Sequence, residues 1–353
     1  MNHYLSFKLK FLSFVSIVMV VISHANSTSV NFAGGSLQIS KSSISFFVQT
    51  FLSTTIARVS LPFFILISGY LFFLNIRPSF ITFKEKFIKR LRTVFLPFFI
   101  WSLWGIVVYY LLQTIPYSKP FFANDLVKDY SILRLIDTLF INPLPYQLWF
   151  LRDLLYLVII SPVILIFVRK FKIGFILMMF LIWFNDISIM PGMHVDSLFF
   201  FSIGCYFSIF QSIYITENSN KRINLLFFIT WFSLCLLNTY LISMDQELSW
   251  DHFITKACTL LTIVFIWRSY DKISDVIPRN LDVFSFTFFI FAAHEPLLTI
   301  QKKVLTFLIG FDEGRSFIIY LFSSILTILI TIYIGKIIRK YIPYLYNVIT
   351  GGR

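Results

Sequence analysis

Residues 8–27, KLKFLSFVSIVMVVISHANS, start with two lysines, continue through a largely apolar run and reach His24 just before small polar residues. This stretch has two interpretations. A secretory signal peptide has a basic start, an apolar run of about 7–15 residues and a small-x-small cleavage site, which Ser23-His24-Ala25 would supply. A first membrane helix would instead keep His24 as a polar group near its outer end. The rest of the chain decides between them.

The composition places the chain among membrane proteins. It has 353 residues, of which 58% are hydrophobic and only 13% are charged, against about 25% charged residues in soluble domains. Continuous apolar runs of about 15–22 residues predict helices, because an outer-membrane barrel would alternate apolar and polar residues. We expect an all-α polytopic membrane protein, a single domain over residues 1–353, with about ten transmembrane helices at 9–27, 47–74, 94–114, 150–168, 173–187, 195–214, 224–243, 252–268, 283–300 and 316–337.

The net charge of +13 has a topological explanation. On a soluble protein it would suggest a nucleic-acid partner, but here Lys and Arg lie in short connections between apolar runs, such as residues 75–93. With ten spans, the basic connections and both termini fall on one side of the membrane, which the positive-inside rule identifies as the cytoplasm. We expect contacts with membrane lipids and no nucleic-acid partner.

His24 is an ionisable residue in a predicted span, where such residues are costly and mark function more often than chance. The alternative is an interfacial histidine near the outer end of a helix. Lys10 precedes His24 by fourteen residues, so at about 100° per residue the two lie within about 40° of one face and about 21 Å apart along the axis. Ser13 is closer still in phase with His24.

Arg58 opens the stretch RVSLPFFILISGYLFF, residues 58–73. Pro62 is expected to bend or start the helix. Gly69, between Ser68 and Tyr70, lets a neighbouring helix pack closely. The alternative to a functional role for this stretch is an anchoring arginine followed by packing residues.

A basic run lies within FKEKFIKRLRTVFLPFFIW, residues 83–101. Lys86, Lys89 and Arg90 are spaced i, i+3 and i+4 on one helical face, and Arg92 follows. Three explanations stay open. The charges mark a cytoplasmic connection, bind anionic lipids, or bind nucleotide phosphates, because Lys and Arg serve all three purposes.

Two polar groups stand at the predicted outer ends of helices. At the start of the fourth span, Trp149 precedes Arg152 and Asp153, a pattern typical of an aromatic belt residue and a local ion pair. In the ninth span, His294 and Glu295 form either an acid–base pair or a hydrogen-bonded helix end. The three cysteines are scattered and lack metal-ligand spacing, so we expect neither a disulfide scaffold nor a metal site.

Five stretches, taken in order, resemble the integral-membrane acyltransferase family 3, which O-acetylates bacterial polysaccharides and related cell-surface molecules. The resemblance extends over nearly the whole chain. Its features are an apolar helix ending in histidine, an arginine before a Pro/Phe-rich segment and Ser-Gly-Tyr, a basic run before a proline-bearing helix, a Leu-Trp-Phe-Leu segment and an aromatic helix ending in His-Glu-Pro. The stretches are FLSFVSIVMVVISH (11–24), RVSLPFFILISGY (58–70), KEKFIKRLRTVFLPFFIWS (84–102), QLWFLRDLLYLVIISP (147–162) and FTFFIFAAHEP (286–296).

The resemblance implies an enzyme of the bacterial inner membrane that moves an acetyl group from cytoplasmic acetyl-CoA to a hydroxyl of a cell-surface glycan or its lipid-linked precursor. It implies that the first helix is retained, because the family's working histidine lies on it. His24 would be a general base or a transient acyl carrier, Arg58 or Tyr70 would stabilise the oxyanion, and His294 and Glu295 would orient the acceptor. The candidate partners of the CoA phosphates are Lys10, Arg58, Lys86, Lys89, Arg90 and Arg92.

Two positions depart from the family pattern. Ser13 stands where the family usually has an arginine, eleven residues before the histidine, and Gln147 stands where a histidine often precedes Leu-Trp-Phe. Lys10, one turn earlier than Ser13, is the candidate substitute for the missing charge.

Two other function classes compete with an acyltransferase. A secondary transporter or flippase would move a lipid-linked sugar without acyl transfer. A membrane sensor would bind acyl-CoA without forming a product. Acyl-CoA-dependent modification of an acceptor distinguishes the enzyme from both.

Overall fold

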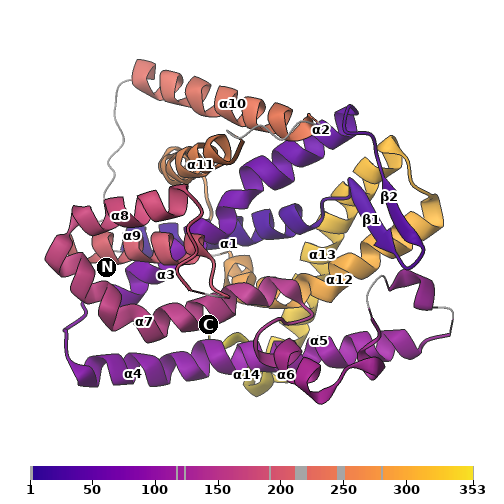
Figure 1. The fold of residues 1–353 in the computed structure, drawn as a ribbon, viewed down its shortest axis with the longest axis horizontal. Helices are drawn as coiled ribbons and strands as arrows, with labels where there is room; N and C mark the ends of the chain where they lie inside the picture. The colour runs from indigo at the N-terminus through magenta and orange to yellow at the C-terminus, as the bar shows by residue number, and fades with distance from the viewer. Residues whose placement is uncertain are drawn as a thin grey trace.

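The computed structural model describes residues 3–116, 118–122, 125–190, 192–210, 221–244, 251–279 and 281–352. It is a bundle of long helices with one short β-hairpin at its edge (Figure 1). The helices are α1 (His3–His24), α2 (Ile44–Thr50), α3 (Ser60–Phe73), α4 (Phe80–Arg90), α5 (Leu96–Thr114), α6 (Ile132–Phe140), α7 (Trp149–Phe171), α8 (Ile173–Phe184), α9 (Val195–Phe210), α10 (Lys221–Ser243), α11 (Asp251–Ile273), α12 (Thr287–Ile309), α13 (Glu313–Tyr341) and α14 (Pro343–Thr350).

The hairpin is an addition to the predicted all-α fold. Strands β1 (Ser29–Phe32) and β2 (Gly35–Gln38) pair antiparallel, with Val30 opposite Leu37. The backbone N–H of Ala33, in its turn, donates to the carbonyl oxygen of Pro120 at 2.9 Å. Strands of four residues carry too little apolar pattern to be predicted beside a long membrane helix.

Eight helical segments of the described residues are long and apolar enough to cross a membrane, judged by length and composition. They are His3–His24, Ile44–Phe73, Phe80–Thr114, Tyr146–Phe171, Lys221–Ser243, Asp251–Ile273, Asp282–Ile309 and Glu313–Tyr341. Two of the ten predicted spans correspond to the shorter apolar helices α8 and α9. The helical polytopic fold is confirmed. The number of crossings and the side on which the termini lie stay predictions.

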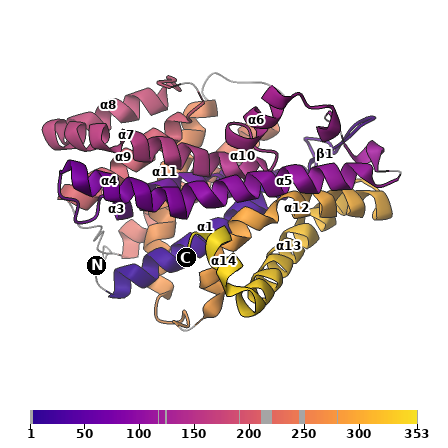
Figure 2. The same ribbon diagram turned by 90° about the horizontal axis from the view of Figure 1, so that it is seen from below.

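The basic run is helical, as the i, i+3, i+4 spacing of Lys86, Lys89 and Arg90 predicts, and it lies in the connection between two predicted spans. α4 continues through a π-helical turn, Leu91–Phe95, into α5, and Figure 2 shows the two as one long helix across the molecule. The Ser79 hydroxyl starts this helix by accepting the backbone N–H of Thr82. No side chain of α4 is fully buried, as expected of a helix that lies at a membrane surface before entering it.

The span that contains Arg58 is irregular in front of its proline. α2 passes into a π-helical turn, Phe51–Ile56, and a 3₁₀ turn, Ala57–Val59, before α3 begins at Ser60. Pro62 lies in the first turn of α3, where its missing N–H removes no intrahelical hydrogen bond. The prediction that this proline bends or starts a helix is confirmed, and Arg58 consequently lies on the irregular turn.

α1 runs through the middle of the bundle (Figure 1), where it packs against α3, α11, α12 and α13. Its C-terminal end has a hydrogen-bond donor for every carbonyl group from residue 21 to residue 27. The donors contributed by other segments are Ser53 Oγ to the Ile22 carbonyl, Lys302 Nζ to the carbonyls of His24 and Asn26, and Ser316 Oγ to the Ser27 carbonyl. The end of α1 is therefore held by three other parts of the chain.

α3 and α9 cross so closely that their backbones touch. A Cβ added at Gly69 would lie 2.5 Å from the carbonyl oxygen of Phe201, and one added at Gly204 would lie 2.3 Å from that of Leu66. Both positions need glycine because the obstacle is backbone, which cannot turn aside as a side chain can. The predicted packing role of Gly69 is confirmed.

We predict that Gly204→Ala destabilises the protein by about 1–3 kcal/mol, because the added methyl forces α3 and α9 apart. Thermal unfolding of the purified protein in detergent measures the effect. Gly174→Ala is the matched control, since a Cβ at Gly174 of α8 meets nothing within 4 Å. Equal melting temperatures for the two variants would contradict the close crossing.

Candidate active site

Two histidines far apart in the sequence meet inside the bundle. His24 ends α1 and His294 lies on α12, with His24 Nδ1 2.9 Å from His294 Nε2. The other ring nitrogen of His294, Nδ1, lies 3.1 Å from the carbonyl oxygen of Ile290, which can only accept a hydrogen bond. His294 Nδ1 therefore carries the hydrogen, and Nε2 of the neutral ring accepts from Nδ1–H of His24. This arrangement leaves a lone pair on His24 Nε2.

This chain of hydrogen bonds leaves His24 with a nitrogen that can accept a proton. His294 is completely buried, whereas His24 is only partly covered. A neutral histidine with an available Nε2 lone pair can take a proton from a hydroxyl group or attack a carbonyl carbon. The accepting nitrogen of His294 would then stabilise the positive charge that forms on the His24 ring.

Glu295 lies at a break in α12. Its backbone is extended (φ −106°, ψ 138°) because Pro296 follows it. Its carboxylate accepts one hydrogen bond from the hydroxyl of Tyr146 and another from the backbone N–H of Thr299, both at 3.3 Å. The ring of Tyr146 also lies against that of His24, with centroids 4.6 Å apart. Tyr146 therefore links the carboxylate to the histidine pair.

A cavity of about 960 Å³, here called the hairpin cavity, opens beside this group. Tyr146, Thr299 and Lys302 form the wall nearest to Glu295, and β1 of the hairpin contributes another wall. The volume lies within the range of about 300–1,000 Å³ typical of ligand sites. The aromatic rings that line the cavity are Phe32, Tyr109, Phe121, Phe122, Tyr130, Tyr146 and Phe307.

Tyr70 is not brought to the histidine pair. It is buried in a cluster with Leu9 and Leu12 of α1 and with Trp267 and Tyr270. Leu12 precedes His24 by twelve residues, which corresponds to about 18 Å along a helix. An oxyanion formed next to His24 would therefore lie out of reach of the Tyr70 hydroxyl.

The basic run lies near the C-terminal end of α3, the helix that also carries Tyr70. Lys86 Nζ donates to the Phe72 carbonyl at 2.5 Å, and the cationic groups of Lys86 and Arg90 lie 5.1 and 5.8 Å from the centre of the Phe72 ring. Lys89 and Arg92 are exposed. Two of the four cations in the basic run therefore close the end of α3, and the other two, Lys89 and Arg92, are available to a ligand.

The buried cation of α1 is Lys8 and not Lys10. Lys8 Nζ is 2.5 Å from Asp271 Oδ1 and 4.0 Å from the centre of the Trp267 ring, and its side chain is 3% exposed. Lys10 is exposed, about 21 Å along the helix from His24. The angular positions of residues around α1 could not predict that Lys8 is the buried lysine, because its carboxylate partner Asp271 lies on α11, more than 260 residues later.

Arg58 lies between the basic end of α1 and the histidine pair. Its neighbours Ala57 and Val59 pack with Met19 and partly with Val15, which places it roughly 8–13 Å from His24 along the axis of α1. Its side chain is exposed and makes no hydrogen bond or ion pair with the part of the chain that the structure describes. Arg58 lies within the candidate membrane span Ile44–Phe73. A guanidinium inside such a span requires water or a polar ligand beside it.

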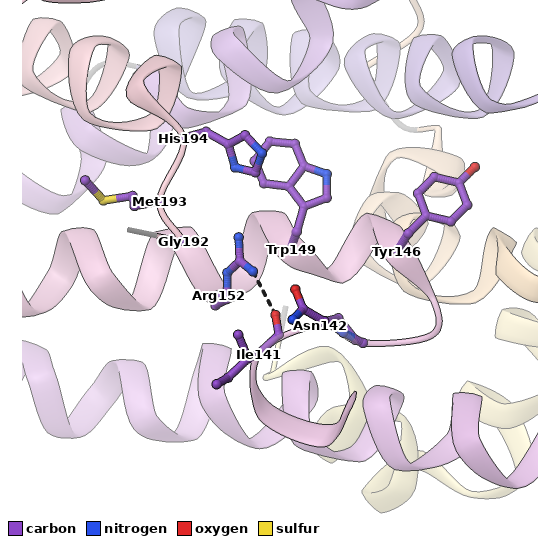
Figure 3. A pocket seen from close by; sticks show the side chains of 9 residues that line it. Ile141, Asn142, Tyr146, Trp149, Arg152, Gly192, Met193 and His194 are labelled. Atoms are coloured by element: carbon purple, nitrogen blue, oxygen red, sulfur yellow. Dashed lines mark hydrogen bonds between the residues drawn. The ribbon is translucent and has the colours of Figure 1, made fainter. Parts of the chain in front are cut away.

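A second cavity, of about 530 Å³, also reaches Tyr146 (Figure 3), and we call it the Trp149 cavity. Its lining comes from the connection between α6 and α7, from the first turns of α7 and from the connection before α9. The lining residues are Ile141, Asn142, Pro143, Tyr146, Trp149, Arg152, Gly192, Met193 and His194.

Asp153 is fully buried behind the Trp149 cavity and accepts five hydrogen bonds. Its Oδ1 accepts from Nε and Nη2 of Arg152, at 3.3 and 3.1 Å. Its Oδ2 accepts from the backbone N–H and Nδ1 of His194, both at 3.0 Å, and from the Ser197 hydroxyl at 2.8 Å. The predicted ion pair between Arg152 and Asp153 is confirmed, and it also joins α7 to the start of α9.

Sequence reasoning missed three residues of this region. Tyr146 and Lys302 have no distinguishing sequence signal, because an isolated tyrosine and a lysine after an apolar stretch are both common in membrane proteins. His194 had a usable signal, the polar stretch MHVDS at residues 193–197 between two apolar helices. Within the described residues, no group of three or more His, Cys, Asp and Glu side chains could hold a metal ion, and the three cysteines are free and buried.

Comparisons with known proteins identify the family of the chain. A family model described as an acyltransferase domain matches residues 8–336. The succinoglycan biosynthesis protein ExoH of Rhizobium meliloti (strain 1021) is 25% identical over 317 residues, which cover 87% of this chain and 82% of that protein. No solved structure matches the chain significantly.

We predict that Asp153→Asn destabilises the protein by about 3–5 kcal/mol, because the buried guanidinium of Arg152 loses its counter-charge. Thermal unfolding in detergent measures the loss. Asp125→Asn is the matched control, because Asp125 pairs with Arg134 at the surface, where its side chain is 69% exposed and an ion pair adds little. A melting temperature of Asp153→Asn as high as that of the control would contradict a structural role for the buried pair.

Proposed function

Because the chain belongs to the acyltransferase domain family, whose model matches residues 8–336, and is a multi-pass membrane acyltransferase, we propose that it transfers an acetyl group from acetyl-CoA to a glycan. The acceptor would be a hydroxyl of a cell-surface polysaccharide or of its lipid-linked precursor. The proposed location is the bacterial inner membrane with both termini cytoplasmic, where acetyl-CoA reaches one face and the glycan the other.

The observation that carries this proposal is the hydrogen-bonded pair of His24 and His294. His24 Nε2 would remove the proton of the acceptor hydroxyl, whose oxygen then attacks the carbonyl carbon of the thioester. The new carbon–oxygen bond gives a tetrahedral oxyanion, which collapses with breakage of the carbon–sulfur bond. The CoA sulfur leaves and takes up the proton from His24, so the products are an O-acetyl ester and CoA. A transient acetyl group on His24 Nε2 would use the same lone pair.

The hairpin cavity is the proposed acceptor site. The relative ExoH is named for the biosynthesis of succinoglycan, and a sugar suits the lining of this cavity. Aromatic rings such as Tyr109 and Phe121 offer flat apolar surfaces to the C–H faces of a pyranose, and the Tyr146 hydroxyl and Lys302 ammonium offer hydrogen bonds to its hydroxyls. Glu295 would hold Tyr146 in place through their hydrogen bond.

Acetyl-CoA would approach from the opposite end of α1. The exposed Lys89 and Arg92 are the proposed partners of its phosphates. The flexible pantetheine arm would then extend along α1 past Arg58, which lies within roughly 8–13 Å of His24 along the axis. Arg58 is the proposed stabiliser of the oxyanion, since it is the predicted cation closest to the histidine pair.

We predict that His24→Ala lowers the rate of acetyl transfer by at least about 100-fold, the contribution typical of a general base. The native and variant proteins are produced in a strain deleted for the gene, and O-acetyl esters are measured on its purified surface glycans. His3→Ala is the matched control, because His3 lies exposed at the other end of the same helix.

His294→Ala is expected to give an intermediate loss, because His24 then loses the acceptor that orients its ring. A His24→Ala protein that is as abundant and as active as the native one would contradict the proposed role. Binding of acetyl-CoA with no ester from the native protein would favour a sensor instead of an enzyme.

We predict that Arg58→Ala lowers kcat about 100-fold with a smaller change in KM for acetyl-CoA, as expected when a stabiliser of the oxyanion is removed. The purified protein is assayed with labelled acetyl-CoA and the surface glycan of the deletion strain. Arg315→Ala is the matched control, since Arg315 is 53% exposed beside Asp312. A raised KM with unchanged kcat would instead place Arg58 on the phosphates of the donor.

A further inference from the structure

We propose that the Trp149 cavity is a second saccharide subsite, in which Trp149 and His194 hold a sugar ring next to the one that is acetylated. The inference rests on the proposed function. It adds that the acceptor is an extended saccharide whose neighbouring sugars are bound as well as the reacting one. The subsite would take a neutral sugar and not an anionic group.

One residue lines both cavities. Tyr146 lines both the hairpin cavity and the Trp149 cavity, and its hydroxyl donates to Glu295 next to the histidine pair. The two cavities have volumes of about 960 and 530 Å³, each within the range of a site for a small ligand. In the proposed arrangement, a chain of sugars passes over Tyr146 and occupies both cavities.

The wall of the Trp149 cavity has the chemistry of a sugar site. The rings of Trp149 and His194 lie against each other, with centroids 4.1 Å apart, and Figure 3 shows them together on one side of the cavity. The indole gives a flat apolar face for the C–H groups of a pyranose. Its N–H makes no hydrogen bond with the described residues, and neither does the side-chain oxygen of Asn142, so a donor and an acceptor are available for sugar hydroxyls.

The charges behind this wall cancel. All three nitrogens of the Arg152 guanidinium are engaged, Nε and Nη2 with Asp153 and Nη1 with the Ile141 carbonyl at 2.7 Å, the bond drawn in Figure 3. The side chain of Arg152 is 8% exposed and that of Asp153 is 0% exposed. The described lining residues of the cavity therefore present no free cation to a phosphate or a carboxylate, and a neutral polyhydroxyl ligand fits it better.

Asp153 also sets the orientation and tautomer of His194. Because an ionised carboxylate only accepts, the hydrogen bond to Asp153 places the hydrogen of the neutral His194 ring on Nδ1. Nε2 is left as an acceptor, and the side chain is 49% exposed to the cavity that it lines. A sugar hydroxyl would thus meet an acceptor that is already positioned before binding, which reduces the entropy lost on binding.

The experiment compares acceptors of different length. Unacetylated surface polysaccharide from the deletion strain is partly hydrolysed and separated into fragments of one, two, three and more sugars. The purified protein is assayed with labelled acetyl-CoA and each fragment, and kcat and KM are determined. The variants are Trp149→Ala, His194→Gln and the control Trp104→Ala, whose ring on α5 is 51% exposed.

We expect the native protein to prefer fragments long enough to fill both cavities. Trp149→Ala should raise KM for these long fragments roughly 3- to 10-fold, the loss of one aromatic stacking contact, with little change in kcat. The preference for long over single-sugar acceptors should fall by the same factor. His194→Gln should give the same pattern more weakly, because the amide keeps one hydrogen-bonding group, and Trp104→Ala should keep the native preference.

A second measurement separates binding from turnover. Long fragments should raise the melting temperature of the His24→Ala protein in the absence of acetyl-CoA, and this shift should shrink when Trp149→Ala is added. The subsite is refuted if native activity is independent of acceptor length, or if Trp149→Ala lowers kcat/KM for all fragments by the same factor. Absence of acetyl transfer by the native protein to every fragment would refute the proposed function itself, whereas an active native protein with a Trp149→Ala variant that behaves as native would refute only the subsite.

Discussion

The open carbonyl groups at the end of α1 are the constraint on which the rest of the site depends. A helix leaves its last carbonyls without partners, and in surroundings of low polarity each one needs a donor. Donors from Ser53, Lys302 and Ser316 fill these positions, and the buried Gln49 accepts the backbone N–H of Ser27 at 2.8 Å. Because these donors belong to separate helical segments, satisfying the carbonyls also gathers those segments around His24.

The same requirement explains why polar side chains collect at this end of the bundle. A buried carboxylate or imidazole is stable only with hydrogen-bond partners, so polar side chains cluster instead of scattering. Glu295 meets Tyr146 and Thr299, and Asp153 gathers Arg152, His194 and Ser197. Each cluster fixes the wall of a cavity. The structural role and the proposed binding role therefore fall on the same groups, and Tyr146 lines both cavities.

The basic side chains divide into those that bind groups of the protein itself and those that stay exposed. Lys8, Lys86 and Arg90 are used within the protein, on Asp271 or on the end of α3, while Lys10, Lys89 and Arg92 stay exposed. A basic pattern predicts that cations gather at one end, because topology alone requires it. It does not tell a capping lysine from a ligand-binding one, since that depends on which carbonyl or carboxylate comes within reach. Arg58 differs from both groups, being exposed on an irregular turn within an apolar span.

The sequence by itself determined the class of the protein, the family, and several of the residues at its centre. Long apolar runs leave no alternative to membrane helices, and His24, His294 and Glu295 are each conspicuous as ionisable residues within such runs. Only the tertiary structure decided that His24 and His294 share a hydrogen bond across 270 residues, that Tyr70 lies elsewhere, and that His194 faces a cavity. Hydrophobic periodicity predicts which face of a helix is buried. It does not predict which helix packs on that face, because that depends on how several helices satisfy their polar groups together.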